Sequence, residues 1–147
     1  MIATIKTILT RDLKKLSHEL EQYSNEANIW KTEQHISNSA GNLCLHIAGN
    51  LNTYIGAALG NTGYVRDRPQ EFSQKDVPRA ELLQRIAHTI TAVEAGLDNV
   101  KETELQHDFP VIIWDKPATY EYTLIHLTTH LAWHLGQVNY HRRLLDK

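Results

Sequence analysis

Hydrophobic residues recur every three or four positions in four stretches of the chain, and polar residues fill the positions between them. This spacing gathers apolar side chains on one face of an α-helix, whose period is 3.6 residues. The first stretch predicts a helix over 2–23, with Lys and Glu residues on its other side. Its apolar positions are Ile2, Ile5, Ile8, Leu9, Leu13, Leu16, Leu20 and Tyr23.

The second helix is predicted to begin after the polar segment ISNSAGN, in which Ser37, Asn38 or Ser39 can each serve as the N-cap. It is expected to run to about Leu59, because the sequence GNTG that follows favours a helix stop. The side chains on its buried face are expected to be Leu43, Ile47, Leu51, Tyr54, Ile55 and Ala58.

The third helix is predicted to begin at Asp76 and Pro78, a capping residue and a first-turn proline, and to reach about Val100. Thr119 is expected to open the fourth helix, which contains residues 125–143. Four amphipathic helices without a convincing sheet predict an all-α four-helix bundle, a single domain over 1–147.

Two long connections, 60–75 and 101–118, join the last three helices and leave the topology of the bundle open. Loops of this length are often functional or disordered. In the second connection, Pro110 and Pro117 bracket a short apolar run, 111–114, which is a candidate for an extended segment.

Composition narrows the class of protein. The chain of 147 residues is 41% hydrophobic and 22% charged, as in soluble globular proteins. Its net charge is −2 and its basic residues are scattered, which disfavours nucleic-acid binding. No apolar run approaches the ~18 residues of a membrane span, and the N-terminus lacks the features of a signal peptide. The single cysteine fits a reducing cytoplasm.

The last helix carries four of the nine histidines. His130 and His134 lie one turn apart on one side, so both imidazoles can bind one metal ion. On a helical wheel His126, Gln137 and His141 fall within about 40° of His130, at the border of the apolar stripe. Histidines at such positions are usually hydrogen-bonded or surface residues, so a metal site requires a third ligand.

His46 on the second helix can supply that ligand. Asn42, His46 and Asn50 lie four residues apart, at the edge of the buried face. Polar lines on two helices of a bundle can face each other and build a metal site. Cys44 points about 160° away from His46 and is interpreted as a small buried residue rather than a ligand.

The sequence lacks the residues that two familiar classes of metal site require. The sequence HLAWH has Leu where a zinc peptidase has its Glu, so the general base of that reaction is missing. A di-iron carboxylate bundle needs two Glu-x-x-His pairs and two further Glu residues, and only Glu104 and His107 show that spacing.

The segments NLCLHIAGNLNTYIG and HLAWHLGQVNYHRRLL, with the GYVRDRPQEF connection, resemble the DinB-like superfamily of helical bundle proteins. That family has one His on its second helix and a His-x-x-x-His-x-Gly-Gln pattern on its last. The matching positions are His46, His130 and His134. The resemblance covers nearly the whole chain and implies a divalent metal (Ni, Zn or Fe) held by these three histidines, and a homodimer.

The resemblance further implies a thiol-dependent enzyme that uses a small-molecule thiol, such as bacillithiol, mycothiol or glutathione, and an electrophile. The sequence has no signature of the cosubstrate. An S-transferase is therefore one hypothesis, and a stress-associated metal-binding or interaction protein without turnover is another. A metal-dependent hydrolase is a third.

The roles of several polar and aromatic side chains have more than one interpretation. Asn42, Asn50 and Gln137 can orient the ligands from outside or hydrogen-bond neighbouring helices. Arg66 and Arg68 can bind an acidic cosubstrate, although ion pairs within the connection, to Asp67 or Glu71, are favoured. His126 and His141 are interpreted as packing or surface residues, and Trp30, Trp114 and Trp133 as core or dimer-surface residues.

Overall fold

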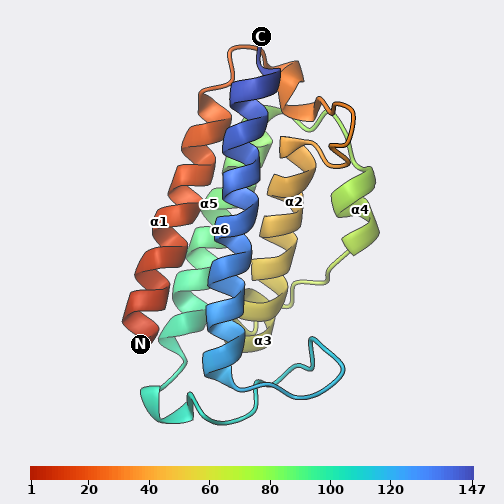
Figure 1. Ribbon diagram of the computed structural model, residues 1–147. Helices are drawn as coiled ribbons and strands as arrows, with labels where there is room; N and C mark the ends of the chain where they lie inside the picture. Colours follow the sequence, from red (N-terminus) through yellow and green to blue (C-terminus); the bar gives the residue numbers. More distant parts are fainter.

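In the computed structural model, which describes residues 1–147, the chain is helical and contains no named strand (Figure 1). Four long helical segments lie side by side, and each belongs to a predicted stretch. Shorter turns join them: the 3₁₀ turns Glu26–Trp30 and Glu102–Glu104, and α4, Arg68–Ser73. The long segments are α1, Ile2–Glu21; α2, Ala40–Leu51, which continues through the π-helical turn Asn52–Ala57 into α3, Ala58–Gly60; α5, Arg79–Asp98; and α6, Tyr120–Leu145.

The four long segments surround one hydrophobic core. Helix α1 contacts α5 and α6, and α2 contacts the same two helices, so every long segment has two neighbours. A single cluster of 24 buried residues fills the space between them, including Leu9, Leu13 and Leu16 of α1 at 0% exposure. Burying one such leucine stabilises the fold by roughly 1.5–3 kcal/mol. No helix is both long and apolar enough to cross a membrane.

Two of the predicted helix starts are confirmed at residue level. The Ser39 hydroxyl accepts a hydrogen bond from the Asn42 backbone N–H at 3.1 Å, and the Thr119 hydroxyl accepts one from Tyr122 at 3.2 Å. The prediction of Asp76 as a cap is wrong. Its backbone is left-handed, with φ of 57°, and α5 begins only after Pro78.

The connection 61–75, which we call the strap, contains a helix that the sequence pattern did not predict. Helix α4 is only six residues long, too short for the apolar periodicity that identified the others. Local chemistry starts it: the Asp67 side chain accepts from the Gln70 N–H at 3.1 Å, and Pro69 lies in the first turn. The strap packs α4 against the outer side of α2 (Figure 1).

The π-helical turn at the end of α2 lies close to α5. A Cβ atom at Gly96 would lie 2.7 Å from the Ile55 carbonyl oxygen, so only glycine permits this approach. The Asn52 side chain donates to the Ala48 carbonyl and to the Thr89 hydroxyl of α5, at 2.8 Å each. The widened turn is therefore held by direct contact with the neighbouring helix.

The connection between α5 and α6 does not form the extended segment suggested for 111–114. Its only strand-like pairing is an isolated bridge between Asp108 and Thr119. Phe109 is the residue that enters the core, at 4% exposure, with its ring centroid 5.2 Å from that of Tyr120. Val111 and Ile112 remain exposed, at 40% and 62%.

Candidate metal centre

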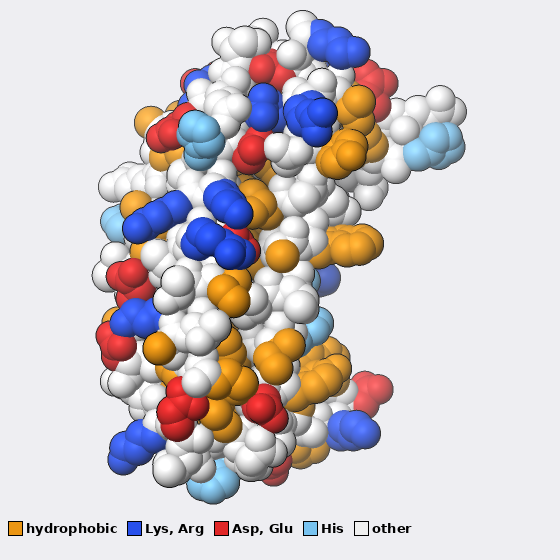
Figure 2. Space-filling view, turned by 60° about the vertical axis from the view of Figure 1, so that its left-hand side comes forward, with side chains coloured by type: hydrophobic (Ala, Val, Ile, Leu, Met, Phe, Trp, Pro, Cys, Tyr) orange, Lys and Arg blue, Asp and Glu red, His pale blue; other side chains and the backbone are white.

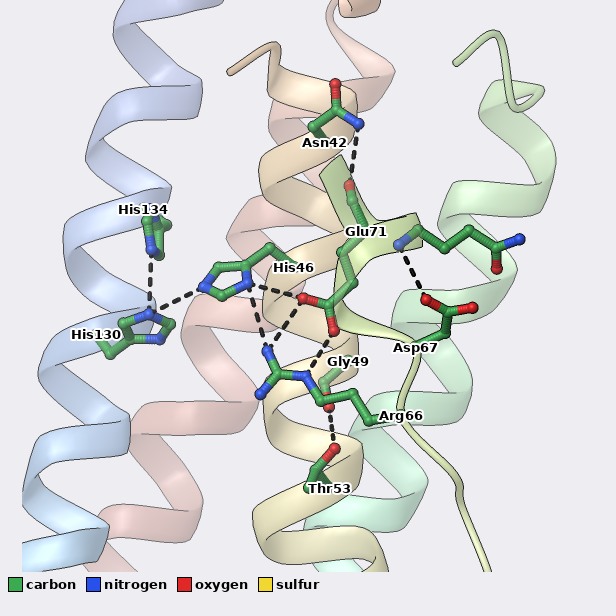
Figure 3. A network of polar contacts seen from close by, with 10 residues as sticks. Asn42, His46, Gly49, Thr53, Arg66, Asp67, Glu71, His130 and His134 are labelled. Carbon is green, nitrogen blue, oxygen red and sulfur yellow. Dashed lines mark hydrogen bonds and ion pairs between the residues drawn. The ribbon is translucent and has the colours of Figure 1, made fainter. Parts of the chain in front are cut away.

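Three histidines from two helices meet between α2 and α6 (Figure 3). The Nε2 atom of His130 lies 3.2 Å from Nε2 of His46 and 3.1 Å from Nε2 of His134. One nitrogen of each ring lies within 4.8 Å of the others. The geometry therefore brings together the three residues that the sequence singled out.

The remaining ring nitrogens of two of these histidines have hydrogen-bond acceptors. His46 Nδ1 lies 2.9 Å from a Glu71 carboxylate oxygen, and His134 Nδ1 lies 2.7 Å from the Gln137 side-chain oxygen. Because both partners accept, both Nδ1 atoms carry the proton, and the Nε2 lone pairs of His46 and His134 face His130.

Of the two contacts that His130 Nε2 makes, to His46 Nε2 and to His134 Nε2, only one can contain a hydrogen-bonding proton. A neutral His130 has only one ring proton, so its Nε2 can donate to His46 or to His134, but not to both. Burial, followed by the nearby charges of His134 and His46, lowers the pKa of His130 to about 4, so the ring is neutral at pH 7. A cation between the rings would give all three lone pairs a partner.

The spacing of these nitrogens fits a bound metal. Two imidazole nitrogens at 2.0–2.1 Å from a tetrahedral zinc ion lie about 3.3 Å apart, close to the spacing of the Nε2 atoms. His46 is 7% exposed and the other two rings are half-buried, so the cluster lies below the surface with one side accessible. A set of three imidazoles suits zinc, nickel or iron.

Glu71 is the site residue that sequence reasoning missed. It lies on α4 of the strap, is 6% exposed, and reaches over α2 to His46 (Figure 3). Burial alone would raise the pKa of Glu71, but hydrogen bonds from His46 and Arg66 outweigh burial and hold its pKa below the usual range. The carboxylate is therefore ionised.

The asparagines flanking His46 do not contact the three histidines through hydrogen bonds. Asn42 instead anchors the strap, donating to the carbonyls of Glu71 and Gln74 at 2.9 and 2.8 Å. Asn50 is 9% exposed, and its side-chain oxygen is buried without a partner. Of the three polar residues with two open interpretations, only Gln137 bonds to one of the histidines directly.

The two arginines of the strap are engaged with neighbouring side chains. Arg66 forms an ion pair with Glu71, with Nε 2.6 Å from one carboxylate oxygen and Nη2 3.0 Å from the other. Arg68 lies over the Phe72 ring, 5.4 Å from its centroid. The predicted ion pairing of Arg66 is confirmed, and its partner is Glu71.

The other histidines of α6 lie beside the cluster rather than in it. The His126 ring stacks on His130 with centroids 6.0 Å apart and meets Trp114 edge-on at 4.9 Å. His141 is buried at 8% exposure, and its Nδ1 has no partner. Trp30 packs against the core, whereas Trp133 is 70% exposed.

The single cysteine is not positioned for chemistry at this cluster. Cys44 is fully buried, and burial raises the pKa of its thiol to about 12. It therefore stays protonated near neutral pH and is a poor nucleophile.

A cavity of about 190 Å³ borders the cluster where α6 approaches the segment before α2. His134 and Gln137 form one wall, and Ser37 and Asn38 lie opposite. No carboxylate lines this cavity. It offers space for a small polar molecule beside His134, the one histidine of the cluster that lines it.

The fold and the cluster together define a helical protein with three converging imidazoles. A family model described as "Protein of unknown function (DUF1572)" matches residues 2–147, and the chain belongs to this family. A comparison with curated proteins gives no significant match.

Proposed function

We propose that this chain is a DinB-like four-helix-bundle metalloprotein that binds one divalent ion, Ni, Zn or Fe, through His46, His130 and His134. The convergence of three imidazole nitrogens, with His130 Nε2 at 3.2 and 3.1 Å from those of His46 and His134 and all three within 4.8 Å of one another, carries this proposal. A cation between the rings would accept all three Nε2 lone pairs, which one proton on His130 cannot do.

We further propose that the protein catalyses transfer of a small-molecule thiol to an electrophile in the cytoplasm. A bound divalent ion with three protein ligands retains an open position and supplies Lewis acidity that lowers the pKa of a thiol or water. The thiol would lose its proton to solvent, its sulfur would bond to the electrophilic carbon, and the leaving group would depart with the bonding electron pair.

Two features of the surroundings support a small-molecule nucleophile. The buried Cys44 thiol, with a pKa of about 12, offers no protein nucleophile. The cavity of about 190 Å³ beside His134 offers space for a polar substrate next to one of the three proposed ligands. Arg68, which is exposed, is the strap arginine left to attract an acidic cosubstrate, because Arg66 is paired with Glu71.

The test combines metal analysis with a thiol panel. Purified wild-type protein is expected to bind a single divalent ion per chain. His46→Ala, His130→Ala and His134→Ala are each expected to weaken binding by more than about 100-fold, because each removes a direct ligand. His88→Ala, which changes an exposed histidine on α5, is the matched control and is expected to bind as wild type.

Turnover separates the possible functions of a protein that binds metal. Conjugation of a model electrophile that requires both metal and one of bacillithiol, mycothiol or glutathione supports the transferase. Bound metal without turnover points to a metal-binding protein, and metal-dependent cleavage without thiol points to a hydrolase. Unchanged metal content in all three ligand variants overturns the site.

We also propose that the protein forms a homodimer through the outer face of α6. Exposed hydrophobic side chains follow this face over about 33 Å of helix. A strip one helix wide covers roughly half of the ~800 Å² that each partner of a stable interface buries. The groove between α1 and α6, with Arg11, Lys15 and Glu19 on one wall, extends the surface. The hydrophobic residues are Tyr122, Ile125, Trp133, Tyr140 and Leu144.

Charge on the neighbouring surface favours a second copy of the chain as the occupant. In Figure 2, hydrophobic side chains project between basic and acidic groups that lie close together on the same face. The groove itself carries both Arg11 and Lys15 and the acidic Asp12 and Glu19. A mixed-charge surface can complement a rotated copy of itself, as a two-fold interface requires.

A further inference from the structure

The carboxylate of Glu71 is placed to act on the three-histidine cluster through His46. It comes from α4, separated by 25 residues from the histidine, and both side chains are buried at 6% and 7% exposure. Their contact, 2.9 Å from Nδ1 to the carboxylate oxygen, is on the side of the ring opposite the cluster. Glu71 therefore touches the ring without blocking its inward nitrogen.

The identity of the donor in this contact follows from the groups around it. Arg66 donates to both oxygens of the Glu71 carboxylate, and a carboxylate in such an ion pair only accepts hydrogen bonds, so the proton lies on His46 Nδ1. The Nη2 atom of Arg66 also approaches Nδ1, at 3.4 Å, but a guanidinium only donates and cannot pair with an N–H. The shorter contact to Glu71 decides the tautomer and leaves Nε2 unprotonated, 3.2 Å from His130 Nε2.

Three features hold the carboxylate in place. Arg66 binds both of its oxygens, at 2.6 and 3.0 Å. Asn42 donates to the Glu71 carbonyl and fixes the backbone of α4. Gly49, one turn after His46, leaves the space that the carboxylate fills, because a Cβ atom there would collide with Glu71 Oε1.

We propose that Glu71 is a positioning residue for metal binding, which acts by fixing the Nδ1-protonated tautomer and the ring orientation of His46. This inference rests on the proposed metal site and names the part of the chain that prepares it. Outer carboxylates of this kind orient a ligating imidazole and make its other nitrogen a stronger donor.

The three histidines are not equally supported. Gln137 holds His134 with a neutral amide oxygen, while His130 makes no hydrogen bond through its Nδ1 and stacks on His126. Glu71 is thus the only charged acceptor bonded to one of the three rings. Its removal is expected to cost more affinity than removal of Gln137.

The first measurement is zinc affinity, determined by competition with a chromophoric chelator. Glu71→Ala is expected to weaken zinc binding about 10- to 100-fold, as is usual for loss of an outer partner. Glu71→Gln keeps an acceptor oxygen and is expected to lose less. The matched control is Glu81→Gln, which removes a carboxylate on the exposed face of α5 that pairs with Arg85 at 2.6 Å. Its zinc affinity should stay at the wild-type value.

Gly49→Ala provides a second route that leaves the carboxylate in the chain. The added methyl group occupies the space of the Glu71 carboxylate and displaces it from His46. Zinc affinity is expected to fall by about the same factor as in Glu71→Ala. Helix content and thermal unfolding of all variants establish that they are folded.

The second measurement is the tautomer of His46 in metal-free protein, read from long-range ¹H–¹⁵N correlations of the imidazole ring. Wild type is expected to show a protonated Nδ1, and Glu71→Ala a mixture of both tautomers. A purely structural role of Glu71 would leave this signature unchanged. An Nε2-protonated His46 in wild type overturns the inference.

The outcomes separate this inference from the proposed function. Wild-type protein that binds no zinc overturns the metalloprotein itself. Wild-type protein that binds zinc through the three histidines, with the wild-type affinity retained in both Glu71→Ala and Gly49→Ala, overturns the role of Glu71 alone. Weaker zinc binding in both variants, with a changed tautomer in Glu71→Ala, supports it.

Discussion

At the scale of single residues, Asp146 fastens the end of α6 to the segment that follows α1. Its carboxylate accepts hydrogen bonds from the backbone N–H groups of Ser24 and Asn25, at 2.6 and 3.3 Å. The Asn28 side chain donates a further one at 2.8 Å. Burial alone would raise the pKa of Asp146, but these bonds lower it to about 2.

This lowered pKa predicts how Asp146 contributes to stability as pH changes. The stabilisation is fully present above the ordinary pKa of 3.8 and is lost as pH falls through about 2, because protonation removes the charge that accepts the bonds. Asp146→Asn is therefore expected to unfold at lower urea concentration than wild type at pH 7. The difference should shrink between pH 4 and pH 2.

The control for Asp146 is Asp115→Asn, which changes an exposed carboxylate without a hydrogen bond or ion pair. Its urea midpoint should follow that of wild type across the same pH range. A deficit of Asp146→Asn that stays constant down to pH 2 would contradict the assignment.

The sequence pattern predicted some residues of the candidate metal centre and missed one. Helical spacing brought His130 and His134 together, and position at the edge of the buried face indicated His46. The role of Glu71 was not predicted, because the sequence of a connection without apolar periodicity does not show whether a carboxylate is solvated or buried. Only the fold reveals that Gly49 leaves space for it.

At the scale of elements, the π-helical turn and α5 form a close helix contact. Gly96 brings its backbone against Ile55, and a Cβ atom there would also lie 2.8 Å from the Ile55 side chain. The neighbour at 2.7 Å is backbone oxygen, which cannot rotate away. The two helices must therefore separate to accommodate any larger residue.

Gly96→Ala is expected to destabilise the fold by about 1–3 kcal/mol through overpacking. The better helix propensity of alanine offsets at most about 1 kcal/mol of this. Chemical denaturation measures the free energy of unfolding. Ala95→Leu, at the exposed neighbouring position, is the control and should change stability by less than about 0.5 kcal/mol. Equal stability of Gly96→Ala and wild type would show that the contact relaxes freely.

Elements were predictable where periodicity and capping chemistry agreed. Ser39 and Thr119 begin α2 and α6, as their side chains and the apolar patterns that follow indicate. Helix α4 was missed because six residues complete less than two turns and show no period. The widened turn at 52–57 was also missed, since its residues continue the apolar spacing of α2.

At the scale of the whole molecule, the outer face of α6 decides the proposed oligomeric state. Trp133→Lys places a charge at the centre of this face, where the tryptophan is 70% exposed. Wild type is expected to sediment at about twice the chain mass of 16.8 kDa, and the variant at the chain mass. Ile112→Lys, which changes an exposed residue outside α6, should remain dimeric. A wild type that sediments as a monomer would remove the proposal.

The global arrangement was the least predictable level. Apolar periodicity predicted four long helices and their inward faces. It could not determine which helices are neighbours, because both inner connections are long enough to span the molecule. Contacts between residues distant in sequence, such as Lys6 with Asp98 at 2.6 Å, establish the pairing of α1 with α5.

The attachment of the strap to His46 has a thermodynamic consequence. If Glu71 prepares His46 for a cation as proposed, a ligand or modification that favours the docked strap strengthens cation binding, and the cation favours the docked strap to the same degree. A segment at the periphery would thereby sense whether the interior is loaded, and a partner that pulled it away would release the ion.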